Sequence, residues 1–103
     1  MNSRSYRGED FQLKELTEKF NWQKKEEQIH KIFVFKTFDL AVDFFNLVAD
    51  AANAHNHHPD ILSSYCSIEI SLTTHDEKKI TEKDLILATK IDELFGNFIG
   101  NEK

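Results

Sequence analysis

Cysteine, proline and glycine are scarce in this sequence of 103 residues, which contains one cysteine, one proline and three glycines. The single cysteine, Cys66, cannot form an internal disulfide, which excludes a small secreted domain held together by disulfide bonds. The glycines stand at positions 8, 96 and 100, so they form no glycine-rich loop of the kind that binds phosphate groups. The sequence therefore predicts neither a disulfide-rich domain nor a nucleotide-binding one.

Long apolar stretches and an excess of positive charge are also absent. No apolar run approaches the roughly 20 residues that a membrane-spanning helix needs, and the N-terminus has no apolar signal core. The 13 lysines and arginines are outnumbered by 18 aspartates and glutamates, which gives a net charge of −5. Direct binding to nucleic acid usually needs a basic patch. We therefore expect a soluble cytoplasmic protein, with a nuclear location also open, that binds neither membranes nor nucleic acid directly.

Apolar residues are plentiful, at 40% of the chain, and nine of them are phenylalanine. A chain of this length and composition forms one folded domain with a single core. The first residues are rich in arginine and serine and show no apolar pattern. We therefore expect a disordered tail over residues 1–8 and one domain over residues 9–103.

Three segments have the spacing of three and four residues between apolar positions that is typical of amphipathic helices. Their starts follow residues that can cap a helix, which are Asp10 in the first, Thr37 or Asp39 in the second and Thr81 in the third. We expect the first helix over about residues 10–20 and the third over 81–95. Pro59 disfavours helical geometry at the residue before it, so we expect it to stop the second helix.

Two further segments are each expected to form a pair of neighbouring strands. Cys66, Ile68, Ile70 and Leu72 alternate with small or polar residues, which predicts a strand that is apolar on one face, with Cys66 in the core. Ile61 and Leu62 are expected to begin its hairpin partner, and residues 32–35 form a strand that pairs with the segment after Trp22. The order is helix, strand, strand, helix, strand, strand, helix. The short connections favour an α+β domain with an antiparallel sheet and helices on one face.

Three of the five histidines lie in the stretch "AHNHHPDI", at positions 55, 57 and 58. Together with His75 they supply enough nitrogen ligands for zinc, so a metal site is one interpretation. No H-E-x-x-H or C-x-x-C spacing is present, however, and the adjacency of His57 and His58 makes joint binding of one ion awkward. His55 continues the apolar stripe of the second helix, and a histidine there interacts well with the negative end of the helix dipole.

A catalytic interpretation needs His57 and His58 to meet polar groups from elsewhere in the fold. The predicted strand that ends at Thr74 and His75 offers one such group, and Asp84 in the first turn of the third helix offers another. A carboxylate at position 84 could hold the tautomer of an imidazole. It could also complete a capping box with Thr81, and the spacing alone favours this second role. No activated serine or cysteine nucleophile is evident, so the remaining chemistry is proton transfer on a small substrate.

At these spacings the chain resembles the pterin-4a-carbinolamine dehydratase family. Five residues separate Pro59 from an aromatic residue, nine more precede a histidine, and eight more precede an aspartate. The positions that carry the resemblance are His57, His58, Pro59, Tyr65, His75 and Asp84. The chain departs from the family at Asn53, where Glu, Asp, Lys or His is usual, at residues 78–80, where a glycine is common, and at Ile61, where animal members have an aromatic residue.

The resemblance implies a four-stranded antiparallel sheet with three helices on one face, and the dehydration of a 4a-hydroxytetrahydropterin to a quinonoid dihydropterin. This reaction recycles the cofactor of aromatic amino acid hydroxylases and needs no metal or other cofactor. By position, the resemblance assigns catalysis to His57, His58, His75 and Asp84. It assigns substrate binding to Asn53, Pro59, Tyr65 and Thr74.

The resemblance also implies a homodimer or homotetramer. Mammalian relatives serve in addition as dimerisation cofactors of a homeodomain transcription factor. Two other functions therefore stay open beside the enzyme: a protein-interaction module without turnover, and a pterin-binding protein of molybdenum-cofactor metabolism. Asn53 is the feature that favours the interaction module, whereas the histidines and Asp84 favour the enzyme.

Overall fold

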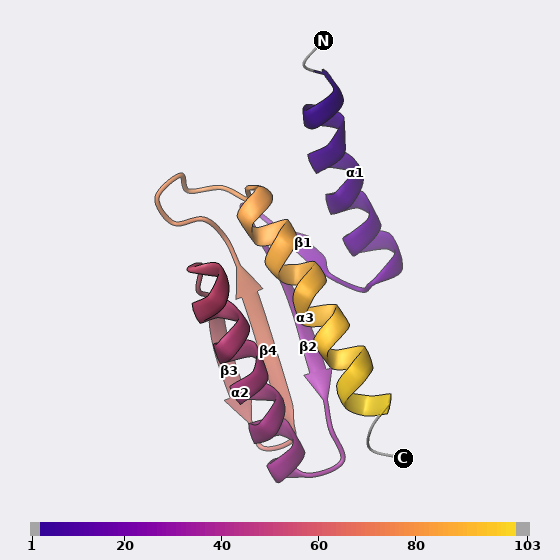
Figure 1. Cartoon of the computed structure of the whole chain (residues 1–103), viewed down its shortest axis with the longest axis vertical. Helices are drawn as coiled ribbons and strands as arrows, with labels where there is room; N and C mark the ends of the chain where they lie inside the picture. The colour runs from indigo at the N-terminus through magenta and orange to yellow at the C-terminus, as the bar shows by residue number, and fades with distance from the viewer. Residues whose placement is uncertain (1–2, 101–103) are drawn as a thin grey trace.

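Three helices cover one face of a four-stranded antiparallel sheet in the computed structural model, which describes residues 3–100 (Figure 1). The elements in chain order are α1 (Ser3–Lys19), β1 (Gln23–Lys25), β2 (Gln28–Val34), α2 (Phe38–His55), β3 (Asp60–Ser64), β4 (Ser67–Leu72) and α3 (Glu82–Gly100). The strand order in the sheet is β1-β2-β4-β3, and every neighbouring pair is antiparallel. The predicted α+β architecture is confirmed.

The alternation of apolar and polar residues in β4 decides which face of the sheet is covered. Ile68, Ile70 and Leu72 are buried, and they lie in register with Phe33, Lys31 and Ile29 of β2. The intervening residues of β4 point to the opposite face, which no helix covers in Figure 1. Helices α2 and α3 pack on the apolar face, and α1 packs beside α3.

Phenylalanine rings fill the space between the helices and the sheet. The ring centroids of Phe33, Phe44 and Phe95 lie 5.0–5.7 Å apart, in the tilted and edge-on arrangements that aromatic rings prefer. Trp22 is also buried, and its Nε1 donates a hydrogen bond of 2.9 Å to Asp92, which also binds Lys31 at 2.7 Å. The polar atoms that enter the core are thus paired with each other.

Several predicted boundaries were wrong. α1 begins at Ser3 instead of Asp10, because the residues before Asp10 include no proline and can continue the helix. A disordered tail was predicted over residues 1–8. Residues 3–8 of it are helical, and residues 1–2 lie outside the described part. α3 continues beyond residue 95 to Gly100. Cys66 lies in the turn after β3 and is half-buried, so it is not a core residue of β4.

The second helix ends earlier than the proline predicted. α2 stops at His55, and Asn56 adopts a left-handed conformation with φ of 51°. The N–H of His57 donates to the carbonyl of Ala52 at 3.1 Å, and the N–H of Asn56 donates to that of Asn53 at 3.2 Å. This is the Schellman pattern of helix termination, in which asparagine is one of the few residues that accept the left-handed conformation.

Among the helices of residues 3–100, none has a stretch both apolar and long enough to span a bilayer.

Candidate active site

The histidine pair lies at one end of the sheet, where three elements meet. Figure 1 shows the end of α2, the loop that leaves β4 and the start of α3 at the same end of the sheet. The Schellman pattern fixes the backbone of His57, because its own N–H is one of the two donors that close the helix. The side chain of His57 is 12% exposed, so it is largely enclosed by these three elements.

His57 contacts Asp84 across the gap between α2 and α3. Nε2 of His57 lies 2.6 Å from Oδ1 of Asp84, and the side chain of Asp84 is 0% exposed. An ionised carboxylate can only accept hydrogen bonds, so its partner nitrogen must carry a proton. In the neutral imidazole this leaves Nδ1 as the unprotonated nitrogen, able to accept a proton. The contact can therefore fix the tautomer of a histidine that transfers protons.

The second oxygen of Asp84 is occupied by the start of α3. Oδ2 accepts 2.9 Å hydrogen bonds from the backbone N–H of Thr81 and from the hydroxyl of Thr74. The Thr81 hydroxyl in turn accepts a bond of 3.3 Å from the N–H of Lys83, the second residue of α3, so the pair forms a variant of the capping box in which the usual acceptor–donor contact with the third residue is shifted by one. Asp84 thus makes both contacts that its position in the sequence allowed: it closes the first turn of α3, and it binds an imidazole.

His58 is held separately on the surface. Its Nε2 lies 3.0 Å from Oδ1 of Asn53, one helical turn back on α2. An amide oxygen only accepts, so Nε2 of His58 is the donor. His55 uses Nδ1 to contact the carbonyl of Ala51 at 2.9 Å, which is the helix-end role predicted for it. His57, His58 and Asn53 are therefore close together, whereas His55 is engaged with its own helix.

The four other predicted site residues are placed differently from one another. Thr74 is buried and reaches Asp84, and His75 follows it in the turn after β4, exposed to solvent. Pro59 comes directly after His58 and is half-buried. Tyr65 lies in the turn at the other end of β3, 76% exposed and stacked on Phe38 with 6.3 Å between ring centroids. The length of β3, about 16 Å at 3.3 Å per residue, separates Tyr65 from the histidines of the same chain.

The sequence did not reveal one member of this cluster. Thr81 was predicted only as a helix cap, but its hydroxyl lies 2.6 Å from the Thr74 hydroxyl and therefore belongs to the group around Asp84. The signal was the Thr-x-x-Asp spacing of residues 81–84. In the part of the chain that the structure describes, no group of three or more His, Cys, Asp or Glu side chains is arranged to hold a metal ion.

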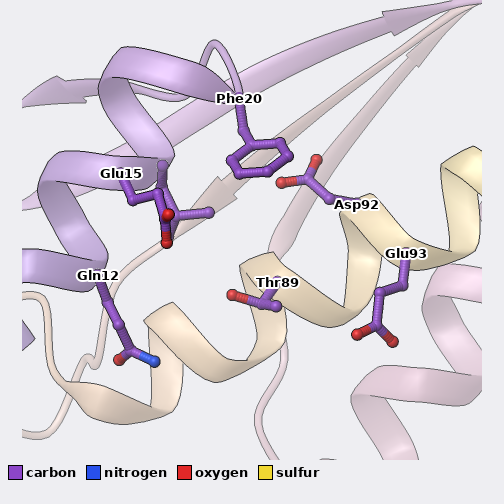
Figure 2. Close-up of a pocket in the computed structure, with 7 residues that line it drawn as sticks. Gln12, Glu15, Phe20, Thr89, Asp92 and Glu93 are labelled. Atoms are coloured by element: carbon purple, nitrogen blue, oxygen red, sulfur yellow. The ribbon is translucent and has the colours of Figure 1, made fainter.

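A pocket lies elsewhere on the molecule, between α1 and α3. It has a volume of about 390 Å³, and Figure 2 shows its lining residues. Its lining consists of Gln12, Glu15, Leu16, Phe20, Thr89, Asp92 and Glu93. The histidines of the predicted site do not line it, and Asp92 is already bound to Trp22 and Lys31. The pocket is therefore distinct from the cluster around Asp84.

Comparison with known proteins identifies the family of this chain. The sequence pattern of the family described as "Pterin 4 alpha carbinolamine dehydratase" matches residues 8–94. A protein of Herpetosiphon aurantiacus provisionally named a pterin-4-alpha-carbinolamine dehydratase is 46% identical over 80 residues, covering 78% of this chain and 83% of the relative. A protein of the same provisional name from Sulfurisphaera tokodaii is 45% identical over 85 residues, covering 79% of this chain and 91% of the relative.

Solved structures show the same fold. A transcriptional coactivator/pterin dehydratase from Brucella melitensis superimposes with a TM-score of 0.68 at 35% identity, covering 71% of this chain and 80% of the other. A pterin dehydratase-like protein identified as a RuBisCO assembly factor in the alpha-carboxysome superimposes with a TM-score of 0.59 at 22% identity, covering 71% and 84% of the two chains, and it shares the fold alone. From the extent of the family match and the identity to its relatives, the chain belongs to the pterin-4-alpha-carbinolamine dehydratase family.

Proposed function

We propose that this protein dehydrates 4a-hydroxytetrahydrobiopterin to quinonoid dihydrobiopterin and so recycles the cofactor of aromatic amino acid hydroxylases. The observation that carries the proposal is the 2.6 Å contact between Nε2 of His57 and the buried Asp84 carboxylate. A buried carboxylate paired with a partly exposed imidazole is the arrangement that prepares a histidine for proton transfer. The names of the relatives from two other organisms support the same reaction.

The reaction needs two proton transfers and nothing else from the protein. The C4a hydroxyl leaves as water after it gains a proton, and a ring nitrogen loses a proton as the quinonoid form appears. We assign these transfers to His57 and His75, while His58 binds the ring or assists. Asn53, Pro59 and the backbone near Thr74 are assigned to substrate binding by their positions in the family pattern. Tyr65 has the same assignment by position alone, because β3 separates it from the histidines of the same chain. No metal, hydride carrier or covalent intermediate enters this scheme.

The decisive experiment follows the decay of enzymatically produced 4a-hydroxytetrahydrobiopterin with and without the protein. We expect the wild type to accelerate the spontaneous dehydration. His57→Ala and His75→Ala should each lose roughly 100-fold or more of that acceleration, because positioned acid–base groups contribute typically 10²–10⁴-fold. His55→Ala is the matched control: its ring hydrogen-bonds the Ala51 carbonyl of its own helix, so the rate should stay close to that of the wild type. A wild type that adds nothing to the spontaneous rate would refute the enzymatic proposal.

A second candidate function is a protein-interaction module that retains the fold without turnover. Asn53 favours it, because the family usually has a charged residue at this position next to the histidines. The Brucella relative, called both a transcriptional coactivator and a pterin dehydratase, makes the alternative concrete. A pterin-binding role in molybdenum-cofactor metabolism is a third candidate. Tight binding of a stable pterin without acceleration of the dehydration would favour that third function, whereas neither binding nor acceleration would favour the interaction module.

We also propose that the chain associates with copies of itself, as a homodimer or homotetramer. The uncovered face of the sheet exposes three large apolar side chains: Ile32 is 56% exposed, Val34 68% and Leu62 63%. Ile32 and Leu62 flank Glu69 of β4 in register, so they lie on the same face of the sheet. Neighbouring exposed apolar residues of this kind mark contact surfaces.

A further inference from the structure

Two threonine hydroxyls and one carboxylate form a connected group beneath His57. The Thr81 hydroxyl lies 2.6 Å from the Thr74 hydroxyl, and the Thr74 hydroxyl lies 2.9 Å from Oδ2 of Asp84. Thr74 is 4% exposed and Asp84 0%, so solvent does not compete for these bonds. Thr74 lies two residues after β4, and Thr81 lies directly before α3, so both ends of the loop between β4 and α3 contact one carboxylate.

The number of available protons determines which atom donates in each hydrogen bond of this group. A threonine hydroxyl has one hydrogen, and the Thr74 hydrogen is donated to Oδ2 of Asp84. The bond between the two hydroxyls must then use the hydrogen of Thr81, with Thr74 as the acceptor. The backbone N–H of Thr81 is a further donor to Oδ2 at 2.9 Å. Oδ2 is thereby supplied with two donors, which leaves Oδ1 as the acceptor for Nε2 of His57.

We infer that Thr81 is a positioning residue which, through Thr74 and Asp84, keeps the proton of His57 on Nε2 and leaves Nδ1 as the atom that exchanges a proton with the substrate. The role in turnover rests on the proposed function, but the position of the proton does not. The Thr81 side chain touches neither His57 nor a substrate atom in this scheme. It orients the Thr74 hydroxyl, which orients the carboxylate. Chains of hydrogen bonds in a buried site strengthen and orient one another in this way.

The simpler alternative is that Thr81 only caps α3. The capping bond to the N–H of Lys83 is 3.3 Å long, whereas the bond to Thr74 is 2.6 Å, so the hydroxyl is more closely engaged with Thr74. Thr37 provides a control, because its hydroxyl accepts a bond of 3.1 Å from the N–H of Leu40 and caps the first turn of α2, at the opposite end of that helix from His57. A Thr37 variant therefore loses a helix cap without changing the group around Asp84, and it can be compared directly with a Thr81 variant.

The test combines nitrogen-15 NMR of the histidine rings with steady-state kinetics on the full chain. In the wild type we expect a protonated Nε2 and an unprotonated Nδ1 on neutral His57. Thr81→Val should raise the fraction of His57 with its proton on Nδ1 and should lower kcat roughly 10-fold with little change in KM, as expected for loss of one hydrogen bond that supports a charged acceptor. Thr81→Ser retains a hydroxyl and should restore both properties, while Thr37→Val should leave both unchanged.

A double-mutant cycle separates action through Thr74 from a general loss of stability. If Thr81 acts through Thr74, the effects of Thr81→Val and Thr74→Val on the His57 tautomer will not add. Additive effects, or a Thr81→Val spectrum identical to that of Thr81→Ser, would overturn the inference. The NMR experiment needs no substrate, so a protein without dehydratase activity but with the expected tautomer would refute only the proposed function. A wild type with the proton on Nδ1 would refute the inference alone.

Discussion

Asp84 joins two tasks that a shorter or more mobile side chain could not combine. As the third residue of α3 its carboxylate reaches back to the N–H of Thr81, and the same carboxylate extends to His57 at the end of α2. The requirement that the side chain close the first turn of α3 also restricts where its second oxygen can lie. The cap therefore pre-organises the carboxylate for the histidine, and less entropy is lost when the two bind.

The sequence predicted both contacts of Asp84 as alternatives, and the structure shows that they occur together. Spacing along the chain predicts the cap, because Thr81 and Asp84 are three residues apart in one helix. The contact with His57 joins residues that are 27 positions apart, so it depends on how α2 and α3 pack. Thr81 was missed as a partner of Thr74 for the same reason: their contact depends on the path of the turn between β4 and α3.

At the scale of single residues, we predict that Asn53→Glu changes kcat/KM of the dehydration by less than about threefold. Oδ1 of Asn53 already accepts a hydrogen bond from Nε2 of His58 at 3.0 Å, and glutamate, one methylene longer, also supplies an acceptor that can reach this surface histidine. The pair is exposed, where the gain from an added charge is small, on the order of 1 kcal/mol or less. Steady-state kinetics of the variant and of the Asn53→Ala control, which removes the acceptor, would check this. A large rise in rate for Asn53→Glu would show instead that Asn53 limits catalysis.

Among the elements, α2 shows why the position of its end matters for the site. The apolar stripe of α2 and its cap at Thr37 followed from the sequence, and both are confirmed. The end of α2 could not be predicted in the same way, because proline is a stronger stop signal in a sequence than asparagine. The left-handed Asn56 reverses the chain before Pro59 is reached and directs His57 toward α3.

For α2 we predict that Asn56→Ala lowers the free energy of unfolding by about 1 kcal/mol, because the left-handed conformation is less favourable for alanine than for asparagine. Thermal unfolding should then shift downward by about 4–8 °C for a domain of this size. Asn56→Gly should be as stable as the wild type or more so. The matched control is Asn46→Ala, an exposed position inside α2 where alanine should be neutral or stabilising. Equal effects at positions 46 and 56 would contradict the role of the left-handed conformation.

At the scale of the whole molecule, the order of elements and the fold class followed from the sequence because β4 alternates without a break and the connections are short. Ile68, Ile70 and Leu72 gave the covered face of the sheet, and they are all fully buried. The extent of α1 did not follow, since its first residues show no apolar period. The sequence also could not show that Ile32, Val34 and Leu62 lie together, because they gather on one face only through the pairing of β2, β3 and β4.

The two edges of the sheet differ in how they would meet another copy. β1 has three residues, all exposed, and two of them are lysines, which discourages pairing with another strand. β3 has five residues, lies at the other edge and exposes Leu62 on the uncovered face. An edge strand of this length without lysine or proline can pair with a second chain. The proposed self-association should therefore involve β3 and the uncovered face more than β1.

We predict that the wild type is dimeric or larger in solution and that Leu62→Lys lowers its mass. The substitution puts a charge on the β3 edge and on the uncovered face, where a partner would have to remove water from the lysine ammonium and from the Glu69 carboxylate beside it. Light scattering coupled to size-exclusion chromatography would measure the mass, with circular dichroism to show that the variant is folded. Ile99→Lys is the control, because Ile99 is an exposed apolar residue near the end of α3, on the layer opposite the uncovered face. If Ile99→Lys dissociates the assembly and Leu62→Lys does not, the contact lies on the helices; a monomeric wild type would contradict self-association altogether.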